Sequence, residues 1–358
     1  MAVSSLSFII VGAGAFGVST ALHLVRRRGR GDSRIGPVLL LDSQPFPSVD
    51  AASNDTSRAV RMDYANEFNA KLGYQAVVAW QNDPTFRPHY HHVGRLGAAR
   101  PGQCSHNMKC REEICKLGVE IEVLSDGSGP GNLKSRFPAL DGPVTGYDLY
   151  FNPEAGWAHP HNALKSAMEE YKCLGGNIID HQTAGKVVKN IINGGVLRGV
   201  ETAAGTRHFA DRILFATGAY SHAELLPGLN TQIHPIGFAI AHWRVDEGEK
   251  RLWENHPVVD LYHHGYFFPP DREGLMKMGT GVMGFGSGSA QVKNEQGDVL
   301  SGLSVPLRNS DLAGTVDEGV IPREAEQAIR WILAQMAPKL ASKPFFDMKI
   351  CWDGMVRG

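Results

Sequence analysis

Residues 6–29 read "LSFIIVGAGAFGVSTALHLVRRRG", and this stretch decides the fold. Its opening part, Leu6–Val11, is apolar on both faces, as expected of a parallel strand buried on both sides. A G-x-G-x-x-G motif follows at Gly12, Gly14 and Gly17, and apolar residues then recur at helical spacing. In such a unit the first glycine allows a sharp turn, the second lets the backbone approach a pyrophosphate, and the third lets helix and strand pack closely. The stretch therefore predicts a dinucleotide bound at the N-terminus of a helix.

Two later segments extend this prediction. The strand "PVLLLD" ends in Asp42, which is placed to bind a ribose hydroxyl. Farther along, a strand at Arg212–Ala216 precedes Thr217 and Gly218, an A-T-G segment typical of chains that return to the sheet beside a dinucleotide. The G-x-G-x-x-G motif alone leaves FAD and NAD both open, whereas the A-T-G segment, which occurs in flavoproteins, favours FAD. The alternatives are a purely structural βαβ unit for the first motif and a plain strand–turn for the second.

The bulk composition limits the classes of function. The chain has 358 residues, 42% hydrophobic and 20% charged, which predicts a globular protein with two domains or one large α/β unit with an inserted lobe. Its 36 basic and 37 acidic residues nearly balance, which argues against a nucleic-acid partner. The glycine spacing at the start favours a buried strand and helix over a membrane span or signal peptide. Five cysteines without a C-x-x-C pair indicate a reduced, intracellular compartment.

A family resemblance begins at residues 48–66, "SVDAASNDTSRAVRMDYAN", whose small and polar residues are typical of a loop that crosses a cofactor. "GWAHPHNALKSAMEEYKCLGGNI", "YFFPPDREGLMKMG" and "MKICW" follow it in order. With the entrance motif and the A-T-G segment, they make the sequence resemble the monomeric sarcosine oxidase and fructosyl amino acid oxidase (amadoriase) family almost from end to end. The resemblance implies an FAD-dependent oxidase of the C–N bond of an N-substituted or cyclic amino acid, of the sarcosine, fructosyl amino acid or pipecolate/saccharopine type. Hydride would pass to FAD, and O2 would be reduced to H2O2.

The resemblance also implies roles for single residues. Arg58 would lie against the flavin ring, and Arg61 would hold the substrate carboxylate, for which a guanidinium fork is well suited. Lys277 would promote the reaction of the reduced flavin with oxygen, because a fixed positive charge stabilises the anion that forms. By pattern alone, the arginines could lie on a solvated face and the lysine on the exposed side of a strand. Cofactor contacts are expected from Gly12, Gly14, Ala15, Phe16, Gly17, Asp42, Ser43, Ser57, Arg58, Thr217, Gly218 and Cys351.

Cys351, in "MKICW", matches the cysteine that bonds covalently to the flavin in this family. The chemistry is reasonable, because a thiolate can add to the 8-methyl position, although an isolated cysteine is more often a small buried hydrophobe. Family members continue beyond this point with a glycine-rich stretch that returns to the flavin, whereas this chain stops at Gly358. We therefore expect a C-terminal truncation, and translation of an intron at the final Val-Arg-Gly is one hypothesis for it. A C-terminal peroxisomal signal would be lost as well.

Three further features of the sequence concern the substrate wall, a glycine-rich run and metal binding. Thr280 and Gly281 stand where sarcosine oxidases have an aromatic residue and a histidine, so the substrate wall differs from theirs. The glycine-rich run Gly279–Gly288 could suggest a phosphate-binding loop, but no G-K-[ST] sequence opens a helix after it. We therefore expect a mobile active-site loop. The histidines lack carboxylate partners at ligand spacing, so we expect no metal; the clustered ones are His89, His91, His92, His263 and His264.

The predicted fold is α/β, with a Rossmann-like FAD-binding domain and an interleaved α+β catalytic lobe built on an antiparallel sheet. The FAD-binding domain would comprise residues 1–88, 152–232 and 345–358. The catalytic lobe would comprise residues 89–151 and 233–344.

The expected partners are a small amino acid-derived substrate and O2, with neither nucleic acid nor membrane. The chain is expected to be a monomer in the cytoplasm or the peroxisome. Two alternatives remain. One is a truncated flavin-binding chain without catalytic activity. The other is an NAD-dependent dehydrogenase, which would leave Lys277 and Cys351 unexplained.

Overall fold

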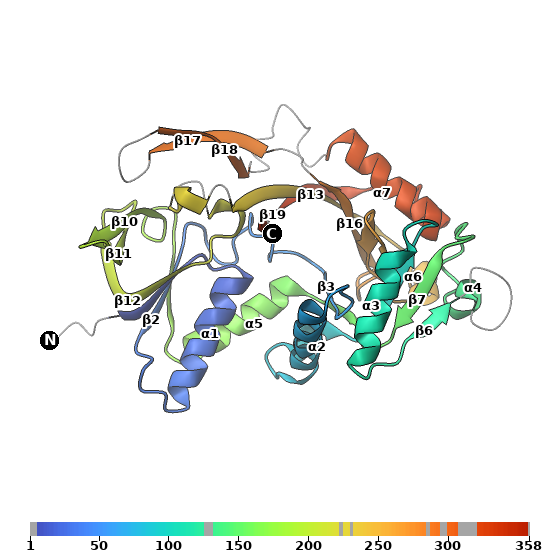
Figure 1. The fold of residues 1–358 in the computed structure, drawn as a ribbon, viewed down its shortest axis with the longest axis horizontal. Coiled ribbons are helices and arrows are strands. Elements are labelled where there is room, and N and C mark those ends of the chain that lie inside the picture. The colour runs from blue at the N-terminus through green and yellow to red at the C-terminus, as the bar shows by residue number, and fades with distance from the viewer. Residues whose placement is uncertain are drawn as a thin grey trace.

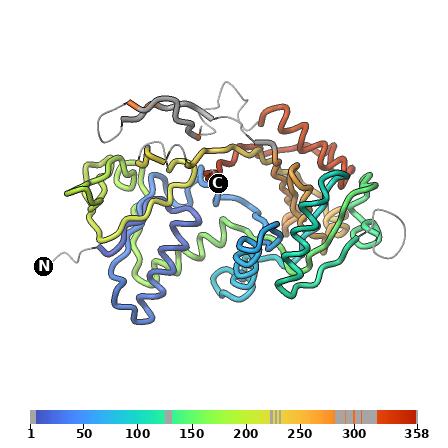
Figure 2. The backbone as a smooth tube through the Cα atoms, viewed as in Figure 1, coloured from blue at the N-terminus to red at the C-terminus, as the bar shows by residue number. Residues whose placement is uncertain are grey.

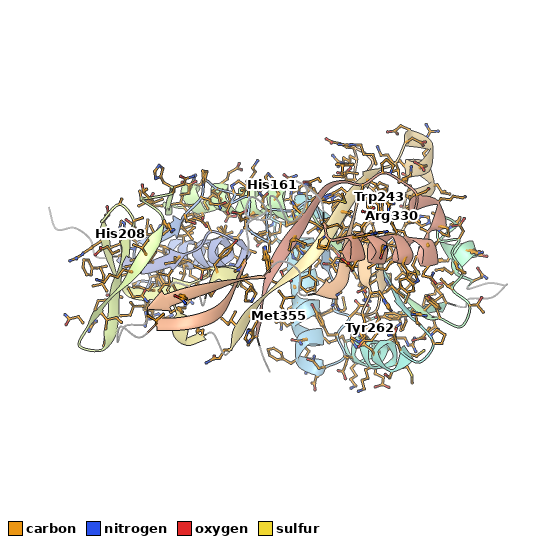
Figure 3. The ribbon with its side chains drawn as sticks, turned by 90° about the horizontal axis from the view of Figure 1, so that it is seen from above. His161, His208, Trp243, Tyr262, Arg330 and Met355 are labelled. Atoms are coloured by element: carbon orange, nitrogen blue, oxygen red, sulfur yellow. The ribbon has the colours of Figure 1, made fainter. Side chains whose placement is uncertain are left out.

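The computed structural model of the chain describes residues 6–124, 132–221, 225–229, 232–283, 287–293, 299–306 and 321–356. In this described part, two large sheets lie toward opposite ends of an elongated molecule, and the long strand β13 (Ile233–Arg244) runs between them (Figure 1). Seen from above, His208 and Trp243 lie toward the two ends and Met355 lies between them (Figure 3).

The six-stranded sheet carries the predicted dinucleotide turn. Its strands, in spatial order, are β10 (Val187–Asn193), β11 (Val196–Thr202), β12 (Arg207–Phe215), β1 (Leu6–Val11), β2 (Val38–Asp42) and β9 (Asn177–Asp180). Strand β1 is parallel to β12 and β2, and β2 is parallel to β9, whereas β10, β11 and β12 are antiparallel. Helices α1 (Ala15–Gly29) and α5 (Pro160–Cys173) pack their apolar stripes on one face of this sheet. The predicted Rossmann-like unit, including a strand at Leu6–Val11, is confirmed.

The turn between β1 and α1 follows directly from its glycines. Gly12 has a φ of +102°, and a Cβ there would lie 2.4 Å from the carbonyl oxygen of Ala216. A Cβ on Gly17 would lie 1.8 Å from the carbonyl oxygen of Gly12. Only glycine allows the strand, the turn and the helix to approach this closely. Gly14 is the N-cap residue of α1, so no side chain caps the helix N-terminus.

The eight-stranded sheet builds the other lobe. Its strands, in spatial order, are β19 (Phe346–Val356), β13, β16 (Leu275–Met283), β15 (Gly265–Phe267), β14 (Val258–Leu261), β5 (Arg95–Ala99), β7 (Asp148–Asn152) and β6 (Glu122–Leu124). The sheet is antiparallel, as predicted, except that β5 and β14 run parallel. Its outer face packs on helix α7 (Arg323–Met336) in the largest hydrophobic cluster, which leaves the inner face available for polar side chains.

Shorter elements complete the described part of the chain. Strands β3 (Arg58–Val60), β8 (Gly156–Ala158) and β4 (Tyr90–His91) form one small sheet, and β17 (Ser287–Lys293) pairs with β18 (Val299–Pro306) in another. The remaining α-helices are α2 (Glu67–Asn82), α3 (Cys104–Lys116), α4 (Leu133–Arg136) and α6 (Glu247–Trp253). No helix that the structure describes is both long and apolar enough to cross a membrane.

The prediction of a loop at Gly279–Gly288 is wrong for most of that run. Strand β16 extends to Met283 and β17 begins at Ser287, while residues 284–286 lie outside the described part. A Cβ on Gly281 would lie 2.6 Å from the carbonyl oxygen of His263. Glycine is therefore needed here for close packing of the β14–β15 turn against β16, rather than for a loop.

The division into two domains remains a prediction. The predicted FAD-binding domain includes residues 345–358, yet β19 pairs along its length with β13 of the eight-stranded sheet. Residues 357 and 358, at the predicted truncation, lie outside the described part.

Candidate active site

The inner face of the eight-stranded sheet carries a row of polar side chains. Strand register places on this face Cys351 of β19, His242 of β13, Lys277 of β16, Tyr266 of β15, Asp260 of β14, Arg95 of β5 and Asn152 of β7. The loop that follows β2, residues 49–57, lies against the start of this row. Chain segments that are about three hundred residues apart in sequence are therefore neighbours here (Figure 2).

Lys277 and Asp55 form a buried ion pair at the centre of the site. Both side chains are only 2% exposed, and the ammonium Nζ donates to the Asp55 carboxylate and, at 2.8 Å, to the carbonyl oxygen of Ser57. Arg58 adds a second positive charge 3.2 Å from the same carboxylate. Its Nη2 also donates to the Ala52 carbonyl at 2.7 Å and to the Sγ of Cys351 at 2.8 Å. Two residues predicted to be functional, Lys277 and Arg58, thus meet at the Asp55 carboxylate, and a third, Cys351, contacts Arg58.

The pKa values in this cluster follow from burial and charge. Burial lowers the pKa of Lys277 to about 8, although the charge of Asp55 opposes the shift. Burial would raise the pKa of Asp55, but Lys277 and Arg58 outweigh it and hold this pKa below its ordinary value. Burial also raises the pKa of Tyr266, whose phenol lies within the electrostatic range of Arg58 and Cys351. The site therefore holds a lysine whose charge changes close to neutral pH.

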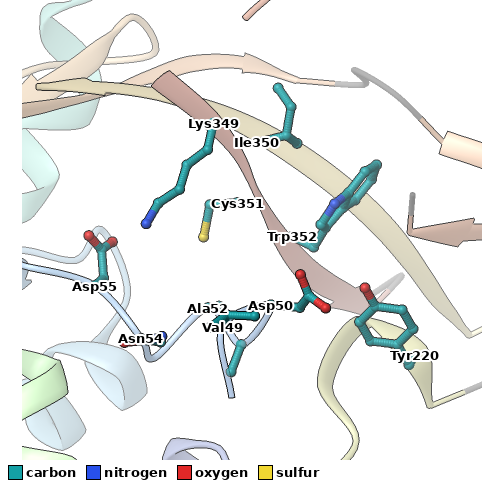
Figure 4. Close-up of a pocket in the computed structure, with 11 residues that line it drawn as sticks. Val49, Asp50, Ala52, Asn54, Asp55, Tyr220, Lys349, Ile350, Cys351 and Trp352 are labelled. Carbon is teal, nitrogen blue, oxygen red and sulfur yellow. The ribbon is translucent and has the colours of Figure 1, made fainter. Parts of the chain in front are cut away.

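An open pocket lies beside this cluster. One wall is the loop from Val49 to Asp55, and the other is β19 from Lys349 to Trp352, with Tyr220 at the side. The side chains of Lys349 and Cys351 point from β19 toward the loop that carries Asp55 (Figure 4). A group bound here would contact Cys351 directly and would lie close to the buried cations.

The dinucleotide end of the site lies at the turn after β1. Asp42 accepts the Ala13 backbone N–H at 2.7 Å, which holds its carboxylate beside the glycine turn. Burial raises the pKa of Asp42 above its usual value, and the hydrogen bond from Ala13 opposes this shift. In the A-T-G segment, Gly218 has a φ of +57°. The backbone N–H of Ala216, the first residue of this segment, donates to the carbonyl oxygen of Val11 at 2.8 Å.

The residues of this end fit an FAD molecule. The α1 N-terminus has no acidic residue in its first turn, so its N–H groups suit a pyrophosphate. The Oγ atoms of Ser53 and Ser57 are buried and have no hydrogen-bond partner in the described part, and Ser53 lies 3.5 Å from where a Cβ on Gly14 would be. Such buried, unpaired polar atoms call for a ligand. Phe16, which is also expected to contact the cofactor, is 82% exposed.

Arg61 lies apart from the Lys277 cluster. Its Nη1 donates to the backbone carbonyl of Asp63, and its guanidinium lies 4.2 Å from the centre of the Tyr64 ring. Burial would raise the pKa of Asp260, but the charges of Arg95 and then of Arg61 outweigh it and hold this pKa below its ordinary value. The predicted carboxylate-binding arginine thus lies within electrostatic range of Asp260 on the inner sheet face.

Sequence reasoning missed several residues of this site, among them Asp55, Tyr266 and His242. Asp55 had a readable signal, because it is an acidic residue three positions before Arg58 in a segment already identified as a loop. Buried His242 had none, because its partners are distant in sequence. Its ring Nε2 lies 3.3 Å from the Thr56 Oγ1, and its Nδ1 lies 3.1 Å from the Asp347 carbonyl oxygen.

Two of the clustered histidines, His91 and His263, lie against aromatic rings. His91 stacks on Trp157 with ring centroids 3.9 Å apart, and Tyr262 lies against both His106 and His263. Within the residues that the structure describes, no three His, Cys, Asp or Glu side chains are grouped so that they could hold a metal ion.

A glycine turn for a pyrophosphate, an acidic strand end for a ribose and a pocket lined by Lys349 and Cys351 are features of an enzyme that binds a dinucleotide cofactor. Comparison with known families agrees, since the model of the FAD dependent oxidoreductase family (DAO) matches residues 7–357. The chain belongs to this family. The predicted enzyme class and FAD dependence are thereby confirmed, and the choice between FAD and NAD is resolved.

Individual proteins of known activity also resemble this chain. L-saccharopine oxidase of Schizosaccharomyces pombe is 26% identical over 365 residues, which cover 97% of this chain and 79% of that protein. The peroxisomal sarcosine oxidase of Homo sapiens is 26% identical over 244 residues, covering 66% of this chain and 56% of that protein. The crystal structure of the fructosamine oxidase Amadoriase II from Aspergillus fumigatus aligns with a TM-score of 0.76 at 30% identity, over 98% of this chain and 76% of that one. The predicted resemblance to sarcosine and fructosyl amino acid oxidases is confirmed.

Proposed function

We propose that the chain is an oxidase of the C–N bond of an N-substituted or cyclic amino acid, of the sarcosine, fructosyl amino acid or pipecolate/saccharopine type. Bound FAD would supply the redox chemistry, taking hydride from the carbon next to nitrogen and passing two electrons to O2, which becomes H2O2. The names of its relatives support this proposal, because they include saccharopine, sarcosine and fructosamine oxidases.

The observation that carries the proposal is the burial of Lys277 beside the pocket. An ammonium that is 2% exposed is costly unless it is paired, and it is paired here with Asp55. Lys277 would place a positive charge where O2 is reduced, and this charge would stabilise the anion as it forms. Its pKa of about 8 keeps it mostly protonated at neutral pH and able to release a proton.

Two arginines would bind the substrate and the cofactor and orient them. Arg61 would receive the substrate carboxylate through two parallel N–H donors, and Tyr64 would keep the guanidinium plane in place. Arg58, held by Asp55 and the Ala52 carbonyl, would lie against the edge of the cofactor and balance its charge.

Cys351 would tether the cofactor. Its buried side chain lines the pocket, and the Arg58 guanidinium donates to its Sγ, which orients the sulfur. Cys351 would supply the sulfur of a C–S bond, and bound FAD would supply its 8-methyl carbon; the S–H and one C–H would be lost, and their two hydrogens and two electrons would leave as H2O2 formed from O2.

The test begins with the absorbance spectrum of the purified chain before and after acid precipitation. Yellow colour in the pellet supports the tether, whereas colour in the supernatant removes the tether and keeps the FAD site. The enzyme is then mixed without oxygen with sarcosine, fructosyl-lysine, pipecolate and saccharopine in turn. Bleaching by one of them, followed by one H2O2 per turnover in air, supports the proposal. Bound flavin that none of them bleaches points instead to a flavin-binding chain without catalysis.

We also propose that the chain is a monomer in the cytoplasm or the peroxisome. All five cysteines are free, which suits a reducing compartment, and one relative carries "peroxisomal" in its name. Sedimentation of the FAD-loaded protein tests the first part, since a mass of twice 39.0 kDa would contradict a monomer. Imaging of a tagged chain in its own cells tests the second.

A further inference from the structure

A buried network of charges on the inner sheet face surrounds the carboxylate of Asp63. One oxygen of Asp63 accepts from Arg95 Nη1 at 2.8 Å and from the Tyr150 hydroxyl at 3.0 Å. The other accepts from Asn152 Nδ2 at 3.0 Å. Arg95, only 6% exposed, also donates to Asp260 at 2.6 Å. Strands β5, β7 and β14 therefore all hold this single carboxylate, directly or through Arg95.

The same residue, Asp63, controls the position of Arg61. Its backbone carbonyl accepts from the Arg61 guanidinium, and the next residue, Tyr64, places its ring 4.2 Å from that guanidinium. The Asp63 side chain is fully buried, so the backbone at this position cannot shift unless the network breaks. A chain of contacts thus runs from the sheet through Asp63 to Arg61, the proposed carboxylate-binding residue.

Stability alone is a poor reason for this network. Replacing a buried ion pair by well-packed apolar residues is often neutral or stabilising, because the charges must lose their hydration. The network here is also incomplete, since the buried Nε of Arg95 has no hydrogen-bond partner among the described residues. What such a network provides is a single allowed geometry, which a site that binds a planar carboxylate through two hydrogen bonds requires.

We infer that Arg95 and Asp63 are positioning residues, which hold the Arg61 guanidinium in the orientation needed to bind the substrate carboxylate. This inference rests on the proposed function, because it takes Arg61 to be the carboxylate-binding residue. Neither Arg95 nor Asp63 acts on the reacting atoms. Loss of the network therefore weakens substrate binding and leaves the chemical step and the FAD site intact.

The test uses the FAD-loaded full chain and one conservative substitution, Arg95→Lys. A lysine offers a point charge instead of a fork and cannot bridge Asp63 and Asp260 with the same geometry. Tyr150→Phe is a milder second variant, which removes one hydrogen bond to Asp63 and keeps the ring. The matched control is Arg26→Lys, because Arg26 also bridges two carboxylates, but in helix α1 far along the chain from this lobe. Steady-state kinetics gives KM and kcat for each variant. Flavin absorbance gives the affinity for acetate and for acetamide, which lacks the charge.

The inference predicts that Arg95→Lys raises KM about tenfold or more and changes kcat by less than about threefold, because a lost charge-assisted contact is worth about a factor of ten. Tyr150→Phe should raise KM by a few-fold, and in both variants acetate should lose its advantage over acetamide while the FAD content stays unchanged. An unchanged KM in Arg95→Lys and Tyr150→Phe, beside a raised KM in Arg61→Met, overturns this inference alone. If Arg61→Met also leaves KM and acetate binding unchanged, the proposed role of Arg61 fails with it.

Discussion

The substitution Asp55→Asn tests the charge balance around Lys277. Burial lowers the pKa of Lys277 to about 8, and the Asp55 carboxylate limits this fall. A hydrogen bond to a charged group contributes about 1.5–3 kcal/mol, which corresponds to a pKa change of about one to two units. Without the carboxylate charge, the pKa of Lys277 should fall to between about 6 and 7. At about pH 7.5 its protonated fraction would then drop from about three quarters to between about one quarter and about 3%.

The sign of the pH effect follows from the charge. Lys277 is positive below its pKa and neutral above it, so a step that needs this charge is fast at low pH and slows as pH rises through the pKa. The assay reduces the flavin with substrate in the absence of oxygen and then mixes the enzyme with oxygenated buffer in a stopped-flow instrument. The wild type should lose its rate of reoxidation around pH 8, and Asp55→Asn about one to two units lower.

The control for this experiment is Asp50→Asn. Asp50 lines the same pocket, but it accepts a hydrogen bond from Gln44 instead of Lys277. Its substitution should leave the midpoint near that of the wild type. The reasoning would be refuted by equal midpoints in the wild type and Asp55→Asn, or by a rate of reoxidation that does not vary with pH in either protein.

Three further predictions concern other parts of the site. Arg61→Met should raise KM for a carboxylate substrate by about ten- to a hundredfold, because a charge-assisted contact worth about 1.5–3 kcal/mol is lost; an unchanged KM in steady-state assays would count against its role. Cys351→Ser should release all flavin into the supernatant on acid precipitation, and colour that stays in the pellet would mean that another residue forms the tether. Gly12→Ala should abolish FAD binding and destabilise the fold by more than about 1–3 kcal/mol, because its φ is +102° and the new Cβ would lie 2.4 Å from the Ala216 carbonyl oxygen. Gly29→Ala, which has open space around its Cβ, should leave both flavin content and the denaturation midpoint nearly unchanged, and a similar loss in both variants would contradict the steric argument.

The parts of the fold that could be predicted are those that local sequence determines. The strand at Leu6–Val11 has the predicted bounds, because an apolar run followed by spaced glycines has few alternative structures. Asp42 lies beside the glycine turn for the same reason. The prediction for the run after Lys277 is wrong, because its glycines are typical of a loop. In fact they allow a neighbouring turn to pack closely on the strand, and that neighbour cannot be read from a local pattern.

The candidate site was predicted one residue at a time, and its connections were not. Pattern alone left it open whether Lys277 is buried or exposed. The answer depends on Asp55, which is 222 positions away in the sequence. The environment of Arg95 depends likewise on carboxylates 32 and 165 positions away. Such pairs are fixed by which strands neighbour each other, and strand order is a property of the whole fold.

The pairing of β19 with β13 has a consequence for how the protein is made. One wall of the pocket is synthesised within the first sixty residues and the other only with residues 349–352. Contacts between such distant segments form late, because the intervening chain must first be ordered. Before β19 has been synthesised the glycine turn can already form, but the pocket beside Arg58 has no second wall. The cofactor should therefore bind only once β19 is made, and stalled chains that end before Phe346 should not retain FAD.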